Sequence, residues 1–192
     1  WKAPWPPGIT SAAPLRPRFA PPWRAPATAS DLERLGKYEI VRQLGQGATS
    51  TVYLGRDLFA QRDVAIKVAA PDALRDPERG KLYTHLFLNE ASLVGKLTHP
   101  HIVHIYDAVV ADALCYIVME YVPGGTLDPY TAPGWLLPVE KVVEIIFKCT
   151  RALDFAFRLG ITHRDIKPAN ILMAGETDIK ISDFGASITS SG

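Results

Sequence analysis

The feature that most constrains the fold is a glycine loop, Gly45-Gln46-Gly47, placed between two predicted strands. Residues 38–44 precede it and residues 51–54 follow it, and the short connection fits an antiparallel pair. Glycines at such a turn let the backbone approach a ligand and point its N–H groups at phosphate oxygens. A dinucleotide-binding fold places its glycines between a strand and a helix. Because a strand follows here, we expect a flap that folds over a ligand, although a plain hairpin turn explains the two glycines about as well.

The other segments of the first half predict a five-stranded antiparallel sheet with one helix. Further strands are expected at residues 64–68, 102–110 and 114–121. Asp76-Pro77 predicts the start of a helix that ends before Thr98, because a capping residue is followed by proline at the first helical position. The side chains expected on one face of this helix are Leu82, Leu86, Leu93 and Leu97.

A mainly helical region is expected after the sheet, which makes the fold class α+β. A long apolar helix is predicted over residues 138–159 and is ended by Gly160, since glycine is the usual residue just past a helix C-terminus. Short strands are expected at residues 171–173 and 179–181.

The first 30 residues differ in composition from the rest. They hold 8 of the 16 prolines, 3 of the 4 tryptophans, four basic residues and no acidic residue. Proline removes backbone donors and interrupts helices and central strands, so residues 1–30 are interpreted as a disordered Pro/Ala/Arg-rich tail. The alternative is a proline-rich docking segment, because residues 4–7 are stiff and extended. Residues 31–192 are expected to form the folded domain.

Charge and cysteine content exclude several classes of function. The 21 basic and 20 acidic side chains give a net charge of +1, which argues against a general nucleic-acid or membrane-surface binder. Cys115 and Cys149 lie far apart in apolar runs, as expected for buried thiols of a reducing compartment. No membrane-spanning stretch or signal peptide is visible, so a cytoplasmic location is expected.

Lys67 is the only charged residue in the apolar run of residues 64–70. A lone lysine in such a strand usually extends to solvent, and otherwise needs an anionic partner. Glu90 lies on the leucine face of the predicted helix, where a carboxylate is costly unless it is paired. Each residue alone fits a solvent-exposed position, but an inward lysine and an inward glutamate explain one another.

Two polar loops carry the remaining candidate residues. Asp165, Lys167 and Asn170 place an acceptor, a cation and an amide in one short segment after the long helix. Asp183 follows the strand at residues 179–181, a position where metal-binding carboxylates are commonly displayed. A polar surface loop and an ordinary turn are the alternative interpretations.

Together and in this order, the motifs resemble those of the eukaryotic-type serine/threonine protein kinases. The resemblance covers about residues 36–192, and residues 38–41, 99–103 and 167–172 resemble the bacterial branch. It rests on Gly45, Gly47, Val52, residues 64–67, Glu90, His163, Arg164, Asp165, Asn170 and residues 183–185. The resemblance implies a kinase-like N-lobe sheet followed by a truncated, mainly helical C-lobe.

The resemblance implies that the cleft binds ATP. The flap covers the triphosphate, Lys67 holds the α- and β-phosphates, and Glu90 holds Lys67. Met119 lies at the back of the adenine pocket. The residues implied to contact the nucleotide are Leu44, Gly45, Gln46, Gly47, Ser50, Val52, Ala65, Lys67, Glu90, Met119, Glu120, Val122 and Leu172. Within this set, the backbone of Glu120 and Val122 bonds the adenine edge, and Ala65 and Leu172 sandwich the base. Ser50 stands where the flap often has a third glycine, a mild departure from the pattern.

The resemblance also implies the catalytic residues. Asp165 accepts the proton of a serine or threonine hydroxyl on a substrate protein, and Lys167 neutralises the transferred phosphoryl group. Asn170 and Asp183 bind Mg²⁺, which prefers hard oxygen ligands. Lys167, two residues after Asp165, follows the serine/threonine pattern. A non-catalytic nucleotide-binding regulatory module and a small-molecule kinase remain as alternatives.

The sequence stops seven residues past Gly185, inside the expected activation segment. The resemblance implies further helices, so the kinase domain is expected to be incomplete and this chain by itself to be inactive. The helix face expected to be exposed comprises Val142, Ile146, Leu153 and Phe157.

Phosphorylation of the activation segment is a further expectation. Arg164 is expected either to pair with a phosphate there or only to brace the catalytic loop. The candidate hydroxyls are those of Ser187, Thr189, Ser190 and Ser191.

Overall fold

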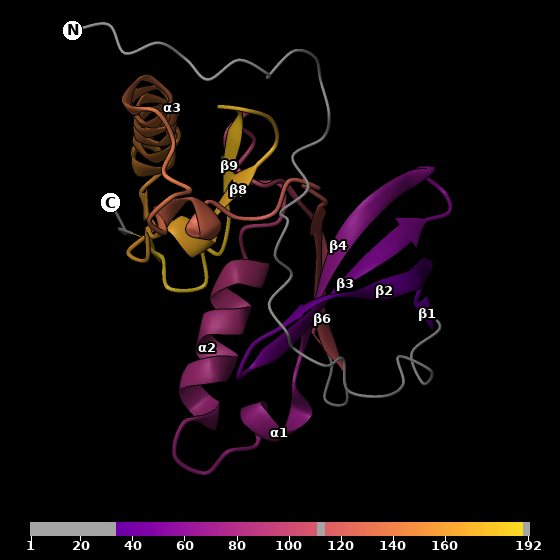
Figure 1. The fold of residues 1–192 in the computed structure, drawn as a ribbon. Coiled ribbons are helices and arrows are strands. Elements are labelled where there is room, and N and C mark those ends of the chain that lie inside the picture. Colours follow the sequence, from indigo (N-terminus) through magenta and orange to yellow (C-terminus); the bar gives the residue numbers. More distant parts are fainter. Residues whose placement is uncertain (1–33, 111–113, 190–192) are drawn as a thin grey trace, which may run out of the picture.

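The structure is a computed structural model that describes residues 34–110 and 114–189, so the tail predicted at residues 1–30 lies outside the described residues. Two lobes make up the described part: a sheet with α2 beside it, and a second lobe that contains α3, β8 and β9 (Figure 1). This arrangement confirms the α+β class.

Six antiparallel strands form the sheet, in the order β1-β2-β3-β4-β6-β5. The sequence predicts five of them. The additional strand, β1, is two residues long, too short for an alternating pattern to reveal it. The chain then reverses at Gly36, whose φ of 57° favours glycine, and Leu35 pairs with Tyr38. The bounds are β1 (Arg34–Leu35), β2 (Tyr38–Gln46), β3 (Ser50–Asp57), β4 (Arg62–Ala69), β5 (Ile105–Val110) and β6 (Cys115–Glu120).

The glycine loop differs from its prediction as a turn at residues 45–47. Gly45 and Gln46 belong to β2 and pair with Val52 and Thr51 of β3. The chain reverses at residues 47–49, where the N–H of Gly47 donates to the carbonyl oxygen of Ser50 at 2.8 Å. Strand pairing therefore extends into the glycine motif and gives a longer flap with a shorter tip.

The helix predicted from Asp76 starts later in the structure. Asp76 does cap, but it caps a turn: its Oδ1 accepts hydrogen bonds from the backbone N–H groups of Glu78 and Arg79 at 2.9 and 2.7 Å. The helix begins one residue after Arg79, and the chain continues as turns from Ser92. The bounds are α1 (Pro71–Leu74) and α2 (Gly80–Ala91).

The inner face of α2 agrees with the predicted leucine face at Glu90 but not at Leu82. Leu82 is 54% exposed, whereas Phe87 and Glu90 are only 7% and 3% exposed. Leu93 and Leu97 are buried but lie past the end of the helix. The leucine pattern was wrong at Leu82 because it assumed one continuous helix through residue 97.

The second lobe follows its prediction closely. Its long helix agrees with the predicted residues 138–159 to within one residue at each end, and Gly160 follows with a φ of 75°. β8 and β9 lie where they were predicted and pair with each other, whereas β7 and β10 were not predicted. The bounds are α3 (Val139–Arg158), β7 (Ile161–Thr162), β8 (Ile171–Met173), β9 (Ile179–Ile181) and β10 (Ile188–Thr189), with short 3₁₀ turns at Asp128–Thr131 and Pro168–Asn170.

One hydrophobic core runs from the sheet into the second lobe. It includes Ile117 of β6, Ile145 of α3, and Ile179 and Ile181 of β9, each at most 2% exposed. Ile102 bridges to Ile181 in parallel, which ties the segment between α2 and β5 to β9. This packing fixes the end of β9, from which the chain continues to Asp183.

Two further findings concern the cysteines and the membrane. Cys149 is buried and Cys115 is half-buried rather than buried, and no disulfide joins them. Within residues 34–110 and 114–189, no helix has the length and apolar character that crossing a bilayer requires.

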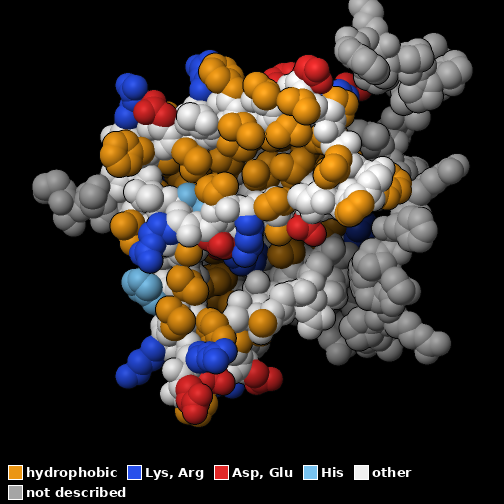
Figure 2. All heavy atoms as spheres, turned by 60° about the vertical axis from the view of Figure 1, so that its left-hand side comes forward, with side chains coloured by type: hydrophobic (Ala, Val, Ile, Leu, Met, Phe, Trp, Pro, Cys, Tyr) orange, Lys and Arg blue, Asp and Glu red, His pale blue; other side chains and the backbone are white. Residues whose placement is uncertain are grey.

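The outer face of α3 carries hydrophobic side chains in contact with solvent. Val143, Ile146 and Phe147 are 61%, 58% and 60% exposed, and hydrophobic side chains gather over this part of the molecule (Figure 2). Exposure was expected for Ile146 and is confirmed, as it is for Val142 and Phe157. It was wrong for Leu153, which packs against the core.

Because α3 exposes these apolar side chains, we expect that copies of the chain of residues 1–192 associate with one another. Changing both Ile146 and Phe147 to lysine should weaken association by about tenfold or more, because two large apolar side chains leave the contact. Sedimentation velocity over a concentration series measures the effect. The control is Phe59→Lys, which changes an 87% exposed side chain on the β3–β4 turn. A wild-type chain that remains monomeric at about 100 µM contradicts the prediction, since weak self-association is expected to be visible there.

Candidate active site

A cleft of about 920 Å³ lies between the sheet and the second lobe, a volume that suits a nucleotide-sized ligand. Lys167 does not line it, although its Nζ contacts Asp165 Oδ2 at 3.1 Å. Every other residue predicted for the site does line it. These are Leu44, Gly45, Gln46, Gly47, Ser50, Val52, Ala65, Lys67, Glu90, Met119, Glu120, Val122, Asp165, Asn170, Leu172 and Asp183.

Lys67 extends from β4 into the cleft and pairs with Glu90 of α2, as predicted. Its Nζ lies 2.6 Å from Glu90 Oε2 and 3.4 Å from Asp183 Oδ1. Strand alternation places Ala65 and Lys67 on the cleft side, while Ile66 is buried on the opposite face. The Glu90 side chain is only 3% exposed, so an unpaired carboxylate at this position would be costly.

Burial and charge act against each other on this pair. Burial lowers the pKa of Lys67. The carboxylates of Glu90 and Asp183 raise this pKa by more than burial lowers it, so the net shift is upward. Burial raises the pKa of Glu90, the ammonium of Lys67 lowers it, and Asp183 raises it, again with a net upward direction. A raised lysine pKa favours the ion pair, whereas a raised glutamate pKa favours the neutral acid. The 2.6 Å contact between the two side chains favours the ionised pair, while Asp183 favours the charged form of Lys67 only.

His163 positions the loop that carries Asp165. Its Nδ1 accepts the backbone N–H of Asp165 at 3.1 Å, so the hydrogen resides on Nε2, which donates to the carbonyl oxygen of Ser182 at 2.8 Å. Its ring contacts Phe184 edge-on with 4.5 Å between centroids. His163 is 2% exposed and therefore connects the two polar loops from inside the molecule.

Asp165 is also held by Asn170. Asn170 Nδ2 donates to the backbone oxygen of Asp165 at 2.9 Å and to its Oδ2 at 3.1 Å. Because the NH₂ group of the Asn170 amide donates to Asp165, the oxygen of the same amide points away from Asp165. The carboxylate of Asp165 remains accessible, with its side chain 41% exposed.

Two residues of the site have left-handed backbones. Arg164 has a φ of 69° and Asp183 a φ of 62°. Such conformations are uncommon outside glycine and are maintained only where the surrounding structure enforces them. Asp183 lines the cleft and Arg164 immediately precedes Asp165. Two of the three described non-glycine residues with positive φ therefore lie in the predicted catalytic segments, and the third, Gln61, lies on the β3–β4 turn.

The connection after β6 forms the back of the cleft. The N–H of Glu120 donates to the carbonyl oxygen of His104 at 2.8 Å, and the side chain of Glu120 pairs with Lys180 at 3.1 Å. Gly124 packs so closely on β8 that an added Cβ would lie 1.9 Å from the carbonyl oxygen of Met173. The strand that carries Met119 is thereby fixed to the second lobe.

Part of the cleft wall was not predicted from the sequence. Leu74 of α1 and Tyr83, Leu86 and Phe87 of α2 line the cleft beyond Glu90. Tyr83 and Phe87 are four residues apart, and Phe87 precedes Glu90 by three, so they share one helical face. That spacing was a usable signal, but the leucine pattern masked it.

The site has the oxygen donors that Mg²⁺ prefers. Asn170 and Asp183 offer an amide oxygen and a carboxylate to the same cleft. Within residues 34–110 and 114–189, no three His, Cys, Asp or Glu side chains are grouped to hold a metal by themselves. Mg²⁺ is commonly held by one or two protein oxygens together with substrate phosphates and water, so these residues fit an ion that arrives with a phosphate ligand.

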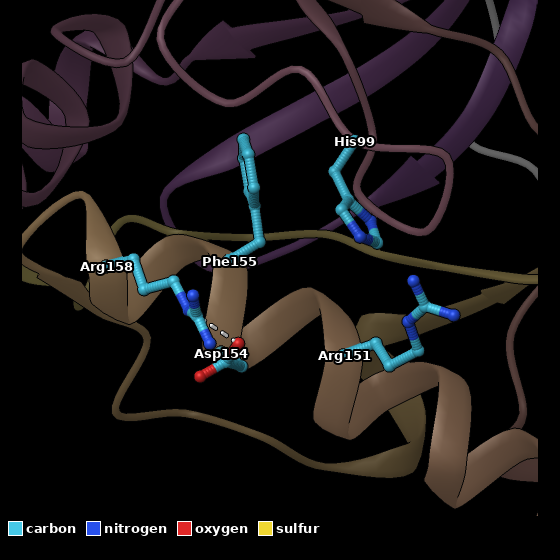
Figure 3. A pocket seen from close by; sticks show the side chains of 5 residues that line it. All are labelled: His99, Arg151, Asp154, Phe155 and Arg158. Carbon is cyan, nitrogen blue, oxygen red and sulfur yellow. Dashed lines mark hydrogen bonds and ion pairs between the residues drawn. The ribbon is translucent and has the colours of Figure 1, made fainter.

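A second cavity of about 330 Å³ lies between α3 and the loop that contains His99 (Figure 3). Arg158 is neutralised there by Asp154 at 2.8 Å, and the ring of His99 lies 5.1 Å from that of Phe155. Burial lowers the pKa of His99, as do the charges of His101, Arg151 and Lys180. None of the predicted site residues lines this cavity.

The expected phosphorylation sites have different surroundings. Ser187 is 6% exposed, and Thr189 belongs to β10. Ser190 and Ser191 lie outside the described residues. Regulation by phosphorylation remains a prediction.

Known proteins resemble this chain over most of its length. Residues 38–191 match the family described as "Protein kinase domain". "Serine/threonine-protein kinase PknB" of Mycobacterium leprae is 40% identical over 153 residues, which cover 78% of this chain and 24% of that protein. "Serine/threonine-protein kinase PrkC" of Bacillus subtilis is 43% identical over 151 residues, which cover 78% of this chain and 22% of that protein. The chain thus spans less than a quarter of the length of these relatives.

Proposed function

Because the chain belongs to the protein kinase family and is similar to bacterial serine/threonine members, we propose that its domain transfers the terminal phosphoryl group of ATP to serine and threonine hydroxyls of proteins. The observation that carries the proposal is a single cleft in which a half-buried lysine pairs with a buried glutamate beside two accessible aspartates. Lys67 contacts both Glu90 and Asp183, and Asp165 lines the same cleft. The domain is assigned to residues 31–192 and to the cytoplasm, where ATP and reduced thiols occur together.

The nucleotide roles follow from the donors and acceptors around the cleft. The N–H of Glu120 is bonded to His104, so Glu120 contributes its carbonyl oxygen to the adenine edge and Val122 contributes its N–H. Ala65 and Leu172 enclose the base, and Met119 closes its back. The ammonium of Lys67 holds the α- and β-phosphates, while Glu90 keeps it from turning to solvent. The flap of residues 44–52 lies over the phosphates.

The transfer step needs positioning and charge neutralisation more than covalent chemistry. The substrate hydroxyl oxygen forms the new bond to the γ-phosphorus while the bond from that phosphorus to the β,γ-bridging oxygen breaks, and ADP leaves. Asp165 accepts the hydroxyl proton, and Lys167, 3.1 Å from it, neutralises the phosphoryl group. Asn170 and Asp183 would hold Mg²⁺, which would offset phosphate charge.

The test is phosphoryl transfer by the full-length protein. Purified protein is incubated with labelled ATP, Mg²⁺ and a generic basic protein, and the phosphorylated residues are identified by mass spectrometry. Phosphoserine and phosphothreonine are the expected products. Nucleotide binding without transfer to any acceptor supports the regulatory module instead, and transfer only to metabolites supports a small-molecule kinase.

The role of Asp183 gives a second expected result. Asp183→Ala should weaken nucleotide binding in Mg²⁺ by about tenfold or more and leave binding in EDTA nearly unchanged, because a charged metal ligand is lost. Titration calorimetry with a non-hydrolysable ATP analogue measures both constants. The matched control is Asp178→Ala, which removes a 71% exposed carboxylate paired with Lys148. Equal losses with and without Mg²⁺ contradict the role.

A further inference from the structure

Asn89, the residue before Glu90 on α2, contacts the segment that follows Asp183. Its Nδ2 donates to the carbonyl oxygen of Gly185 at 2.9 Å and to that of Ser187 at 2.6 Å, and lies 3.2 Å from Ser187 Oγ. Asn89 belongs neither to the lysine–glutamate pair nor to the proposed transfer step. Ser187 is 6% exposed and Asn89 is half-buried, so these contacts are partly shielded from solvent.

The chemistry of the contact requires an amide. Two backbone carbonyl oxygens need two N–H donors, and one NH₂ group supplies both from a single nitrogen. This demand also fixes the amide orientation, because the side-chain oxygen cannot face two carbonyls. Neither aspartate nor leucine, the side chains closest in size, can donate there. A buried carbonyl without a donor costs more than the hydrogen bond itself contributes.

The bonded segment is a tight turn pressed against α2. The N–H of Ser187 donates to the carbonyl oxygen of Phe184 at 2.9 Å, which closes the turn. A Cβ on Gly185 would lie 3.3 Å from the carbonyl oxygen of Leu86, which shows how near the turn lies to the helix backbone. Asn89 therefore connects the helix to the carbonyls on the outside of this turn.

These contacts complete a ring that includes both charged pairs. Along α2, Asn89 is adjacent to Glu90; Glu90 binds Lys67; and Lys67 contacts Asp183. Two residues after Asp183, the chain returns to Asn89 through Gly185. If α2 moves outward, the Lys67–Glu90 contact and the Asn89 contacts are lost together.

We propose that Asn89 is a positioning residue that holds the segment after Asp183 on α2, so that Asp183 is aligned for Mg²⁺ beside the Lys67–Glu90 pair. The inference rests on the proposed function, because it assigns Asp183 to the metal. Asn89 does not touch the nucleotide cleft and acts only through Gly185 and Ser187. Its loss should therefore affect metal-dependent binding rather than adenine binding.

The experiment compares Asn89→Leu and Asn89→Ala with wild type in the full-length protein. The affinity for a non-hydrolysable ATP analogue is measured in Mg²⁺ and in EDTA, and amide hydrogen exchange is followed over residues 184–189. Losing the donors should reduce the Mg²⁺-dependent gain in affinity by about 5- to 20-fold, as expected when one buried hydrogen-bonded group is removed. Affinity in EDTA should change less than about twofold, and exchange over residues 184–189 should speed up.

Two controls separate the inference from simpler explanations. Leu88→Ala changes a 43% exposed neighbour on the same helix and should leave both affinities unchanged. Asn89→Gln keeps the NH₂ group and should recover part of the Mg²⁺-dependent gain. If the Asn89 variants keep the wild-type gain, or lose affinity equally in EDTA, the inference is overturned. A wild-type protein that shows no Mg²⁺-dependent gain at all contradicts the proposed function instead.

Discussion

Asp165→Asn is expected to abolish phosphoryl transfer while nucleotide binding stays within about twofold of wild type. Asn170 Nδ2 donates a hydrogen bond to Asp165 Oδ2 at 3.1 Å. The side-chain oxygen of an asparagine can accept this bond too, so the loop should keep its shape. Asparagine cannot accept the hydroxyl proton, and removal of a general base typically costs about a hundredfold or more. Initial rates with a generic basic protein, together with calorimetric nucleotide affinities, measure the two effects in the full-length protein.

The control for Asp165 is Asp154→Asn on α3. Asp154 is 55% exposed and pairs with Arg158 on the surface, so this change also removes one carboxylate but should leave the rate unchanged. If Asp165→Asn retains near-wild-type rates, the proton acceptor has been assigned to the wrong residue. If it loses nucleotide affinity in parallel with rate, the substitution has disturbed the fold of the loop instead.

Lys67→Met is expected to abolish transfer and also to destabilise the domain. Methionine is close in length but carries no charge, so Glu90 is left in a site where its side chain is only 3% exposed. Removing one partner of a buried ion pair typically costs about 3 kcal/mol or more. Urea unfolding monitored by circular dichroism gives the change in the free energy of unfolding, and nucleotide affinity should fall as well because the phosphates lose their cation.

The loss of stability in Lys67→Met should depend on pH with a definite sign. Burial already raises the pKa of Glu90 above its usual 4.5, and removing the ammonium takes away an interaction that lowers it. A group whose pKa is raised in the folded state contributes stability below its unfolded pKa and loses it as pH rises through the folded pKa. The variant should therefore be closest to wild type near pH 4.5 and progressively less stable toward pH 8.

A second substitution tests this account of Glu90. Adding Glu90→Gln to Lys67→Met removes the titrating group, so it should restore stability at pH 8 and change little near pH 4.5. A double variant as unstable at pH 8 as the single one means that lost packing, rather than an unpaired carboxylate, explains the effect. Transfer should remain absent in both variants, because neither carries the cation.

The predictions from sequence were best where the signal was local. α3, β8 and β9 were placed within one residue, because long periodic helices and short apolar strands beside turns carry their own pattern. The Lys67–Glu90 pair was also predicted, since each residue is a lone charge on an apolar face. The roles of the site residues in nucleotide binding and transfer remain predictions that the proposed experiments address.

The errors arose where contacts distant in sequence decide the outcome. Asp76 satisfies the N–H groups of a turn, and α2 begins only after that turn, so the capping signal marked the wrong boundary. Leu82 is exposed and Phe87 buried because α2 packs against β5, which the leucine spacing could not show. Gly45 belongs to a strand because β3 provides it with a partner.

The sequence by itself determined the α+β class, the family resemblance and the residue types of the site, because motif order and hydrophobic period are properties of the chain. Only the tertiary structure decided that Lys67 also contacts Asp183, and that Asn89 reaches the turn at Gly185 and Ser187. Nothing in its local sequence distinguishes Asn89 from other polar helix residues. Its partners are the carbonyls of two buried residues, Gly185 and Ser187, and Gly185 lies 96 residues further along the chain. Hydrogen bonds between distant segments depend on how the lobes pack, and no local pattern encodes that packing.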